Sequence, residues 1–289
     1  MKPKIIITGS KGQLGHSLQE HSLLNDEFTC YFFSKAELDI TNAASLENKF
    51  EEINPDFFIN AAAYTAVDNA EKDIEKCFII NDYALKDISE LCNSNSTKLI
   101  HISSDYVYHL DTDQPLKEND ATLPKGIYAQ SKLAGEQKII TSGCQYSIIR
   151  TSWVYAAQGH NFVKTVIRLA QEKESMNVVN DQIGTLTYAN DLAEVIYKIL
   201  NSHKPEVWNQ IYNFSNEGRT NWYEIAKFIV SYLKLPLNVH PIATSEYPTP
   251  AERPLWSLLN KTKIKNTLGI TIPQWEASLE KCLKELMVS

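Results

Sequence analysis

A tyrosine and a lysine four positions apart are the residues of this chain best suited to proton transfer. Tyr128 and Lys132 lie in the segment YAQSKLAGEQ, which contains one glycine and no proline. On a helix, positions i and i+4 share a face, so the phenol and the ammonium lie side by side. A free phenol has a pKa of about 10, and a neighbouring positive charge lowers it toward the useful range. The alternative is an amphipathic helix with a half-buried tyrosine and a solvated lysine, since this spacing is common by chance.

A glycine-rich turn near the N-terminus indicates a phosphate site. The β-branched run 4–8 predicts a buried strand, and Gly9, Gly12 and Gly15 follow it before a helical pattern that continues to Leu23. Gly9 permits a tight turn, Gly12 lets the backbone approach a pyrophosphate, and Gly15 allows close packing of helix on strand. The helix N-terminus offers free N–H groups to the anion. The turn therefore predicts nucleotide binding, although its spacing differs from the G-x-G-x-x-G of common dehydrogenases.

The end of the second predicted strand bears on the choice of cofactor. In dinucleotide-binding folds an acidic residue at this point binds the ribose hydroxyls and selects NAD. Here the strand 28–33 is followed by Ser34 and Lys35, so there is a cation and no carboxylate. Lys35 is placed to meet a 2′-phosphate, which favours NADP(H), and the alternative is a solvated loop lysine. A strand end is expected at 38–41, with Asp39 near the adenine.

Polar or small residues follow the next two predicted strands. The strand 56–60 leads into three alanines, which let the backbone pass close to a flat ligand or pack tightly in a core. The strand 98–104 ends in hydroxyls and a carboxylate, where ligands of such sheets bind. His101 within it is expected to be a packed core or pocket-wall residue. Asn81 lies inside the predicted helix 73–93, where an asparagine is unfavourable unless its side chain bonds something.

Strands alternating with helices, about 25–35 residues per unit, predict an α/β fold of Rossmann type with a doubly wound parallel sheet. The pattern loosens after Trp153, and all five tryptophans lie from there to Trp275, so the second half offers a stacking surface. Helices are expected there at 161–173, 188–200, 221–233 and 279–287, short strands at 177–179 and 210–215, a turn at 181–185 and a proline-rich ordered loop at 236–254.

These patterns also divide the chain into domains. We expect an NADP(H)-binding Rossmann domain at 1–155, completed by about 187–214. A smaller C-terminal α/β domain at 156–186 and 215–289 is expected to bind the substrate.

Composition excludes several classes of function. The net charge of −7 and the absence of a Lys/Arg cluster argue against nucleic acid or an anionic membrane as partner. No apolar run approaches the ~20 residues of a membrane span, and the apolar segment near the N-terminus is too short for a signal peptide. The cysteines show no metal-binding spacing, so we expect free thiols in a reducing cytoplasm and claim no metal. They are Cys30, Cys77, Cys92, Cys144 and Cys282.

Several longer blocks carry a more specific resemblance. With the glycine triplet and Tyr128-x-x-x-Lys132, the sequence resembles the extended short-chain dehydrogenase/reductases and, within them, the dTDP-4-dehydrorhamnose reductase family. The resemblance covers nearly the whole chain. One departure is Ser104, where the family usually has threonine, and the hydroxyl is kept. The blocks are NAAAYTAVDNAE at 60–71, SDYVY at 104–108, RTSWVY at 150–155, NFVKT at 161–165, DQIG at 181–184 and YPTPAERP at 247–254.

The resemblance implies reduction of the 4-keto group of dTDP-4-dehydro-β-L-rhamnose by a reduced nicotinamide. The end of the second strand, with Lys35 and no carboxylate, predicts that NADPH is preferred and NADH still usable. It implies that Tyr128 gives the proton, that Lys132 favours the phenolate and holds the nicotinamide ribose, and that Ser104 bonds the carbonyl oxygen. The implied substrate contacts are Ser104, Asp105, Tyr106, Trp153 and, for the diphosphate, Arg253. The implied cofactor contacts are Gly9, Gly12, Gln13, Leu14, Gly15, Ser34, Lys35, Asp39, Ile40, Ala61, Ala62, Ala63, Thr65, Asn81, Ile102, Tyr128 and Lys132.

Two other functions stay open on the sequence. A sister reductase or epimerase acting on another nucleotide sugar differs only in a few pocket contacts. A regulatory subunit on the same scaffold is expected to have lost Tyr128 or Lys132, and both are present. A homodimer is expected only by analogy with the family.

Overall fold

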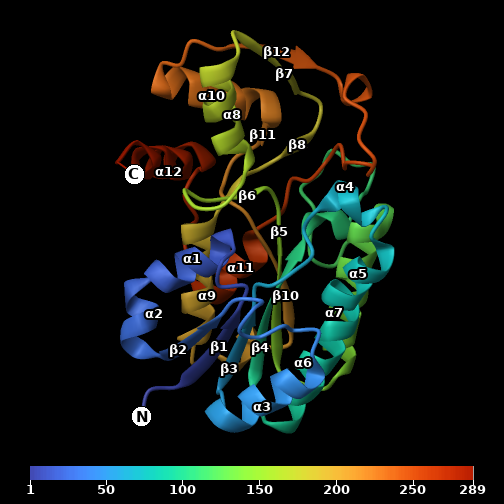
Figure 1. The fold of residues 1–289 in the computed structure, drawn as a ribbon, viewed down its shortest axis with the longest axis vertical. Helices are drawn as coiled ribbons and strands as arrows, with labels where there is room; N and C mark the ends of the chain where they lie inside the picture. Colours follow the sequence, from blue (N-terminus) through green and yellow to red (C-terminus); the bar gives the residue numbers. More distant parts are fainter. Residues whose placement is uncertain (289) are drawn as a thin grey trace.

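A six-stranded parallel sheet forms the centre of the molecule in the computed structural model, which describes residues 1–288. Its strand order is β10-β5-β4-β3-β1-β2 (Figure 1). The predicted doubly wound α/β fold is thus confirmed. The strands are β1 (Lys4–Thr8), β2 (Thr29–Phe33), β3 (Phe57–Asn60), β4 (Lys98–Ser104), β5 (Tyr146–Thr151) and β10 (Gln210–Phe214).

Helices cover both faces of this sheet, which is why its strands read as continuous apolar runs. Successive side chains of a strand point to opposite faces, so Ile5 and Ile7 pack in one core and Ile6 in the other. The first face carries α1 (Gln13–Glu20), α2 (Ser22–Glu27), α9 (Ala189–Leu200) and α11 (Thr262–Leu268). The second carries α3 (Ala43–Ile53), α5 (Ile74–Phe78), α6 (Ala84–Ser94) and α7 (Gly126–Thr141).

The strand order reverses at β1. The chain leaves β1 for β2 on one side and returns to β3 on the other, so both strands flank β1. In open α/β sheets, ligands bind in the crevice outside the carboxyl ends of the strands at such a switch point. The order therefore directs attention to the turn after Thr8 and to the segment after Asn60, which are paired in register.

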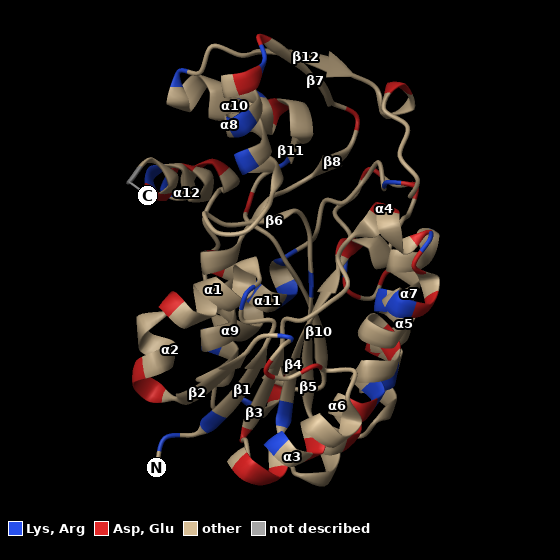
Figure 2. Ribbon diagram, viewed as in Figure 1, with Lys and Arg blue, Asp and Glu red and all other residues tan. Residues whose placement is uncertain are grey.

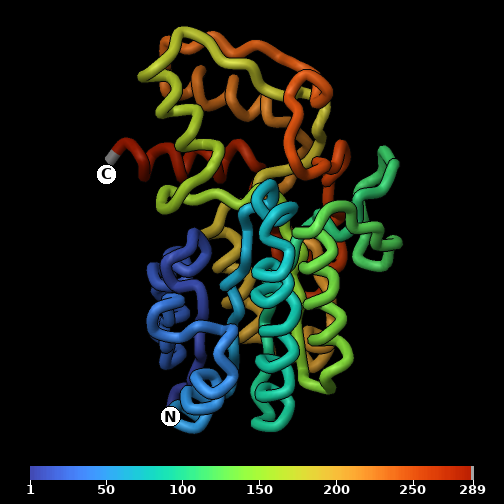
Figure 3. Tube along the Cα trace, turned by 45° about the vertical axis from the view of Figure 1, so that its right-hand side comes forward, coloured from blue at the N-terminus to red at the C-terminus, as the bar shows by residue number. Residues whose placement is uncertain are grey.

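A smaller lobe with its own core lies beyond the carboxyl ends of the strands, opposite the N-terminus (Figures 1 and 3). We propose that this separate core marks a second domain. Helix α11 falls within the range expected for that domain and instead packs on the central sheet, because Ile264 joins the core of the sheet. The lobe contains β6 (Val154–Tyr155), α8 (Phe162–Glu172), β7 (Ser175–Val179), β8 (Ile183–Gly184), β9 (Thr187–Tyr188), β11 (Thr220–Asn221), α10 (Trp222–Leu233), β12 (Asn238–Ile242) and α12 (Trp275–Val288).

Some local expectations were wrong. Residues 38–41 form no strand. The chain turns over 39–42, where the Asp39 carboxylate accepts hydrogen bonds from the N–H and the hydroxyl of Thr41. The first helix breaks at His21, whose ring caps α2 by accepting the Leu24 N–H at 3.1 Å. The loop expected at 236–254 contains β12, which pairs in parallel with β7. Helix α11 had no counterpart in the expected pattern.

Short helical turns complete the fold. They are α4 (Val67–Ala70), η2 (Asp105–Val107), η3 (Pro205–Val207) and η4 (Thr244–Glu246). No helix within residues 1–288 is long and apolar enough to cross a membrane. Acidic and basic positions are interspersed along the outer helices (Figure 2).

A π-helical turn, η1 (Ile79–Tyr83), joins α5 to α6 and explains the buried asparagine within this helix. The Asn81 amide bonds both the N–H and the carbonyl of Tyr64, at 2.9 and 3.1 Å, and donates to the Ser131 hydroxyl at 3.1 Å. Helix α7 packs so closely here that a Cβ added to Gly135 would lie 2.0 Å from the Asn81 carbonyl oxygen. Turns of this kind are frequent at functional sites.

Replacing Gly135 with alanine should lower the free energy of unfolding by about 1–3 kcal/mol, because overpacking forces α7 away from η1. Helix propensity alone predicts the opposite sign, a gain of about 1 kcal/mol. Urea unfolding followed by circular dichroism measures the difference. Gln137→Ala, on an exposed position of the same helix, serves as the control and should change little. A Gly135→Ala variant more stable than the wild type would contradict the close packing.

Candidate active site

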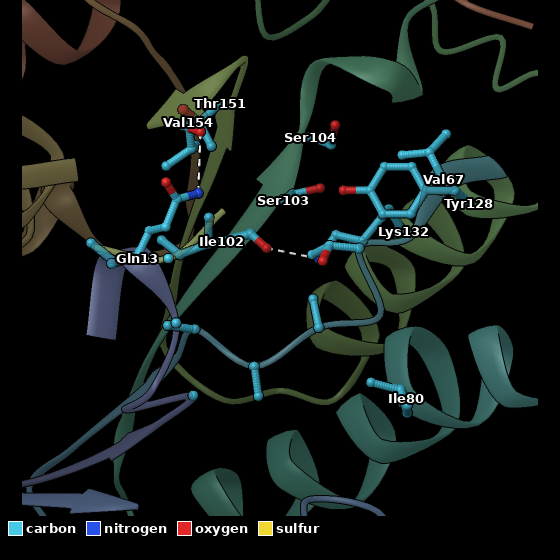
Figure 4. Close-up of a pocket in the computed structure, with 18 of the residues that line it drawn as sticks. Gln13, Val67, Ile80, Ile102, Ser103, Ser104, Tyr128, Lys132, Thr151 and Val154 are labelled. Carbon is cyan, nitrogen blue, oxygen red and sulfur yellow. Dashed lines mark hydrogen bonds between the residues drawn. The ribbon is translucent and has the colours of Figure 1, made fainter. Parts of the chain in front are cut away.

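A cavity of about 790 Å³ opens at the carboxyl ends of β1, β3, β4 and β5 (Figure 4). Four expected site residues, Gly15, Ser34, Asn81 and Arg253, are not among the described residues that line it. The expected residues that line it are Gly9, Gly12, Gln13, Leu14, Lys35, Asp39, Ile40, Ala61, Ala62, Ala63, Thr65, Ile102, Ser104, Asp105, Tyr106, Tyr128, Lys132 and Trp153.

The glycine turn forms a cradle of the kind that a pyrophosphate needs. Gly9 has φ +74°, and a Cβ there would lie 2.6 Å from the Ala61 carbonyl oxygen. The Gly12 N–H donates to the Gly9 carbonyl at 2.9 Å, which closes the turn. Helix α1 begins after Gly12 with no side-chain cap and no acidic residue in its first turn. Its N–H groups are thus available to an anion, so the residues fit a dinucleotide cofactor. Gly15 lies behind the cradle, where an added Cβ would meet Gly9.

Two lysines line the cavity beside the glycine turn and the end of β2. Lys35 has a side chain 70% exposed and stands 3.7 Å from the Asp39 carboxylate, and Lys11 of the glycine turn also lines the cavity. Ser34, expected at the cofactor, is instead buried, and its N–H donates to the Glu37 carboxylate at 2.8 Å. The chain turns at this point, which takes Ser34 away from the cavity and leaves the cations facing it.

The phenol of Tyr128 lines the cavity, and its hydroxyl points toward the end of β4, where Ser103 and Ser104 lie (Figure 4). Burial raises its pKa above the ordinary 10, and the carboxylate of Asp105 acts in the same direction, while a hydrogen bond with Ser104 lowers it. The expected lowering of this pKa by the lysine was therefore wrong for the protein alone. The phenol stays protonated at neutral pH, which is the state of a proton donor.

Asp105 is buried next to this phenol. One carboxylate oxygen accepts the Ser104 hydroxyl at 3.0 Å, and the other has no hydrogen-bond partner among the described residues. Burial raises its pKa from 3.8 to about 6, and the nearby hydroxyls of Ser257 and Ser104 lower it less than burial raises it. An unsatisfied buried oxygen is costly, so it marks a place for a donor from a ligand.

The ammonium of Lys132 is almost fully buried, with 1% of the residue exposed. It donates to the Ile102 carbonyl at 2.7 Å (Figure 4) and lies 3.2 Å from Nε2 of His101. Burial lowers its pKa from 10.5 to about 8, although Glu136 and Cys77 raise it. His101 is a buried wall residue, as expected.

Asn81 positions the alanine segment instead of lining the cavity. Both ends of its amide are used by the backbone of Tyr64 and the hydroxyl of Ser131. It thus ties the segment after β3 to α7, which carries Tyr128 and Lys132.

An aromatic wall closes the cavity on the side of the smaller lobe. The rings of Trp153 and Trp222 stack with centroids 4.1 Å apart. Trp153 has φ +48°, an unusual conformation for a bulky residue and one that marks local strain. Gly184 makes room for it, because an added Cβ there would lie 2.8 Å from the Trp153 ring.

Arg253, expected at a diphosphate, is already paired. Its guanidinium forms an ion pair with Asp68 and donates to the Tyr106 hydroxyl at 2.9 Å. The proline-rich segment that carries it is tied down further by Lys125, which pairs with Glu252 at 2.7 Å. Arg253 therefore holds this segment against α4 and η2. Contact with a diphosphate would require these bonds to break.

Several cavity residues were not among the expected contacts. Lys11 lies in the glycine turn, where its charge was a usable signal. Ser103 ends the strand 98–104, and Thr151 and Val154 lie in the block RTSWVY, so local patterns pointed to these three as well. The unexpected residues besides Lys11 come largely from elements far apart in the chain. They are Leu38, Val67, Ile80, Ser103, Thr151, Val154, Gly159, His160, Leu192 and Trp222.

Comparison with known proteins finds consistent full-length matches. The family model described as "RmlD substrate binding domain" matches residues 2–288. The spore coat polysaccharide biosynthesis protein SpsK of Bacillus subtilis (strain 168) is 36% identical over 98% of this chain and 97% of its own length. The dTDP-4-dehydrorhamnose reductase of Escherichia coli (strain K12) is 35% identical over 99% and 98%. A crystal structure of dTDP-4-dehydrorhamnose reductase from Bacillus anthracis in complex with NADP superposes with a TM-score of 0.94, at 40% identity over 99% of this chain and all of the other.

Asp105→Asn should change how stability depends on pH. The folded carboxyl has its pKa raised from 3.8 to about 6, so in that interval the folded state binds a proton that the unfolded state has lost. Stability of the wild type therefore falls as pH rises through this window, by up to about 3 kcal/mol. Asparagine does not titrate, so the variant should gain on the wild type by that amount between about pH 4 and pH 7.

Urea unfolding at several pH values measures this gain. Glu51→Gln, at an exposed carboxyl of α3, is the control and should run parallel to the wild type. Parallel curves for Asp105→Asn as well would mean that Asp105 titrates normally.

Proposed function

We propose a reductase function for this chain, which belongs to the family described as "RmlD substrate binding domain". In this proposal it reduces the 4-keto group of dTDP-4-dehydro-β-L-rhamnose to give dTDP-β-L-rhamnose, using NADPH. The observation that carries the proposal is the placement of Tyr128, Lys132 and Ser104 in one cavity with the glycine cradle. The choice of sugar follows the names of two relatives that this chain matches over nearly its whole length, both dTDP-4-dehydrorhamnose reductases. The product is an activated sugar for the synthesis of surface polysaccharides.

Bound NADPH supplies a hydride to the carbonyl carbon. Negative charge then develops on the carbonyl oxygen, which needs donors fixed in place beforehand. The Tyr128 phenol gives its proton to this oxygen, so that the carbonyl becomes a secondary alcohol. Ser104 donates a second hydrogen bond and sets the angle at which the oxygen lies. The raised pKa of Tyr128 keeps the phenol protonated until the charge appears.

Lys132 acts on the phenol after transfer. Its ammonium lies one helical turn away on α7 and stabilises the phenolate that remains. We assign the nicotinamide ribose to the same ammonium, since its bonds to His101 and Ile102 leave one N–H donor unused. Burial of both groups strengthens these interactions, because water does not screen them.

The substrate side of the proposal rests on the aromatic wall and the end of β4. Asp105 has an unsatisfied buried oxygen that a sugar hydroxyl would satisfy. Tyr106 and Trp153 line the same part of the cavity and offer a hydroxyl and a flat apolar face. Arg253 would bind the diphosphate only after its ion pair with Asp68 opens.

A panel of sugar nucleotides tests the proposal against a sister reductase or epimerase. Purified protein is offered keto sugars attached to dTDP, UDP and GDP, with NADPH consumption and product identity recorded. The dTDP-4-keto-rhamnose substrate should have the highest kcat/KM. Faster turnover of another sugar would move the chain to a sister activity, and no turnover at all would favour a regulatory role.

Location and assembly stay part of the proposal. All five cysteines lie in the described part of the chain and are free thiols. Free thiols fit the reducing cytoplasm expected from the sequence. A homodimer is proposed by analogy with the family, and sedimentation equilibrium tests it.

Tyr128→Phe should lower kcat about 10²–10⁴-fold while NADPH still binds, because only the donated proton is lost. Steady-state kinetics and cofactor fluorescence titration measure the two effects. Tyr197→Phe removes a phenol hydroxyl on α9, bonded to Glu27 outside the cavity, and should leave kcat unchanged. A Tyr128→Phe enzyme that retains more than about a tenth of wild-type kcat would assign the proton to another group.

Lys35→Ala should weaken NADPH about ten- to a hundredfold and leave NADH unchanged, because a charged hydrogen bond to the 2′-phosphate is worth about 1–3 kcal/mol. The kcat/KM values for the two cofactors measure the preference. Lys86→Ala, on the surface of α6, is the matched control. An undiminished preference in Lys35→Ala, lost only when Lys11 is also replaced, would place the phosphate on Lys11 instead.

A further inference from the structure

A row of buried polar side chains crosses the sheet beneath the cavity. Thr8, Asn60 and His101 are paired in register on β1, β3 and β4, so their side chains lie side by side on one face. The Thr8 hydroxyl donates to the Asn60 amide oxygen at 2.7 Å, and the Asn60 amide nitrogen lies 3.2 Å from Nδ1 of His101. None of the three is more than 1% exposed. Burying a polar group lowers stability unless the group is hydrogen-bonded, so a continuous polar row in a sheet core indicates a functional role.

The row ends at Lys132. Nε2 of His101 lies 3.2 Å from the lysine nitrogen, which also donates to the Ile102 carbonyl at 2.7 Å. The ammonium thus has two contacts on the protein side. Its remaining donor is free to face the cavity, where the proposed reaction takes place.

The proton positions along the row depend on the charge of the lysine. Burial and the charge of Lys132 lower the pKa of His101 well below 6.5, so the ring is neutral and carries one proton. When Lys132 is an ammonium, Nε2 must accept and the ring proton sits on Nδ1. For this state the Asn60 amide has to turn over, because in the structure its oxygen accepts the Thr8 hydroxyl at 2.7 Å and the Ala62 N–H at 3.3 Å, and its nitrogen faces Nδ1. When Lys132 is a neutral amine, Nε2–H donates to it and the Asn60 amide nitrogen donates to Nδ1.

We propose that His101 is a positioning residue that holds Lys132 and stabilises its charged form, with the Asn60 amide turning over when the tautomer of the ring changes. The inference rests on the proposed function, since Lys132 is given its role there. His101 does not line the cavity and reaches the reaction only through the lysine. Without an acceptor at Nε2, the ammonium would keep only the Ile102 carbonyl as a protein partner.

Other titratable groups act on the same ammonium and have to be kept constant. Glu136 lies one turn along α7 and is neutralised by its ion pair with Arg150 at 2.6 Å. Cys77 on α5 lies near the ammonium, and Tyr128 lies one turn before Lys132 on α7. None of these is altered by a substitution at His101.

Two substitutions distinguish a role of His101 as hydrogen-bond acceptor for Lys132 from a role in packing alone. His101→Phe keeps the ring and removes both nitrogens, and His101→Gln places an amide oxygen near the position of Nε2. In His101→Phe the alkaline limb of the kcat/KM profile should move to lower pH by about 1–2 units, the equivalent of one hydrogen bond to a charged group. In His101→Gln it should return toward the wild type. A uniform loss of kcat with an unmoved limb would overturn the proposal, because packing alone explains it.

A measurement without substrate separates this inference from the proposed function. Protein carrying ¹³Cε-lysine is titrated by NMR, and the Lys132 signal is identified by its absence in Lys132→Met. The Lys132 pKa should be lower in His101→Phe than in wild type and near wild type in His101→Gln. His21→Phe, at a half-buried histidine paired with Glu194, is the control and should not move it. An equal Lys132 pKa in all proteins would overturn the proposal even if the enzyme reduces the expected sugar.

The wild type alone provides a further test that does not depend on folding of a variant. In protein carrying ¹⁵N-histidine, the His101 proton should move from Nδ1 to Nε2 as Lys132 loses its charge. The two ring nitrogens should therefore exchange their chemical-shift character with the same midpoint as the lysine titration. Ring nitrogens that do not change through that titration would overturn the proposal.

Discussion

An ammonium group from which water is almost completely excluded is the constraint on which the site depends. Transfer of a charge into a protein interior costs several kcal/mol even after relaxation. Lys132 is 1% exposed, and the carbonyl of Ile102 and the ring of His101 offset only part of that cost. The result is a pKa lowered to about 8, within reach of neutral pH. A lysine in this state stabilises a neighbouring phenolate strongly, because no solvent screens the two charges.

Such a lysine has to be held by a helix that cannot shift. Helix α7 meets η1 at a distance that only Gly135 allows, and its far side is fixed by the buried ion pair of Glu136 with Arg150. Removing one partner of a buried ion pair is strongly destabilising, typically by about 3–5 kcal/mol, so this pair also fixes the position of α7. Asn81 then ties the segment that follows β3 to the same helix. The close packing around α7 therefore fixes the positions of the phenol and the ammonium that this helix carries.

The other half of the cavity is assembled differently. Its wall is a stacked pair, Trp153 and Trp222, from segments far apart in the chain. Its edge is held by Arg253, which bridges Asp68 and Tyr106 and so connects the proline-rich segment to α4 and η2. Polar pairs at a partly exposed edge contribute less than buried ones, so this edge is less strongly held than α7. The reaction centre is therefore built on packed elements and the substrate edge on exchangeable contacts.

The sequence by itself determined the features that depend on local periodicity and local chemistry. Runs of apolar residues gave the parallel strands, the glycine spacing gave the turn after β1, and the i, i+4 rule placed Tyr128 beside Lys132, because each is set by neighbours in the chain. Only the tertiary structure decided the partners. It occupied Arg253 with Asp68, turned Ser34 away from the cavity, and brought β12 onto β7. The reason is physical: contacts between residues far apart in the chain depend on how whole elements pack, and no local pattern encodes the distance between them.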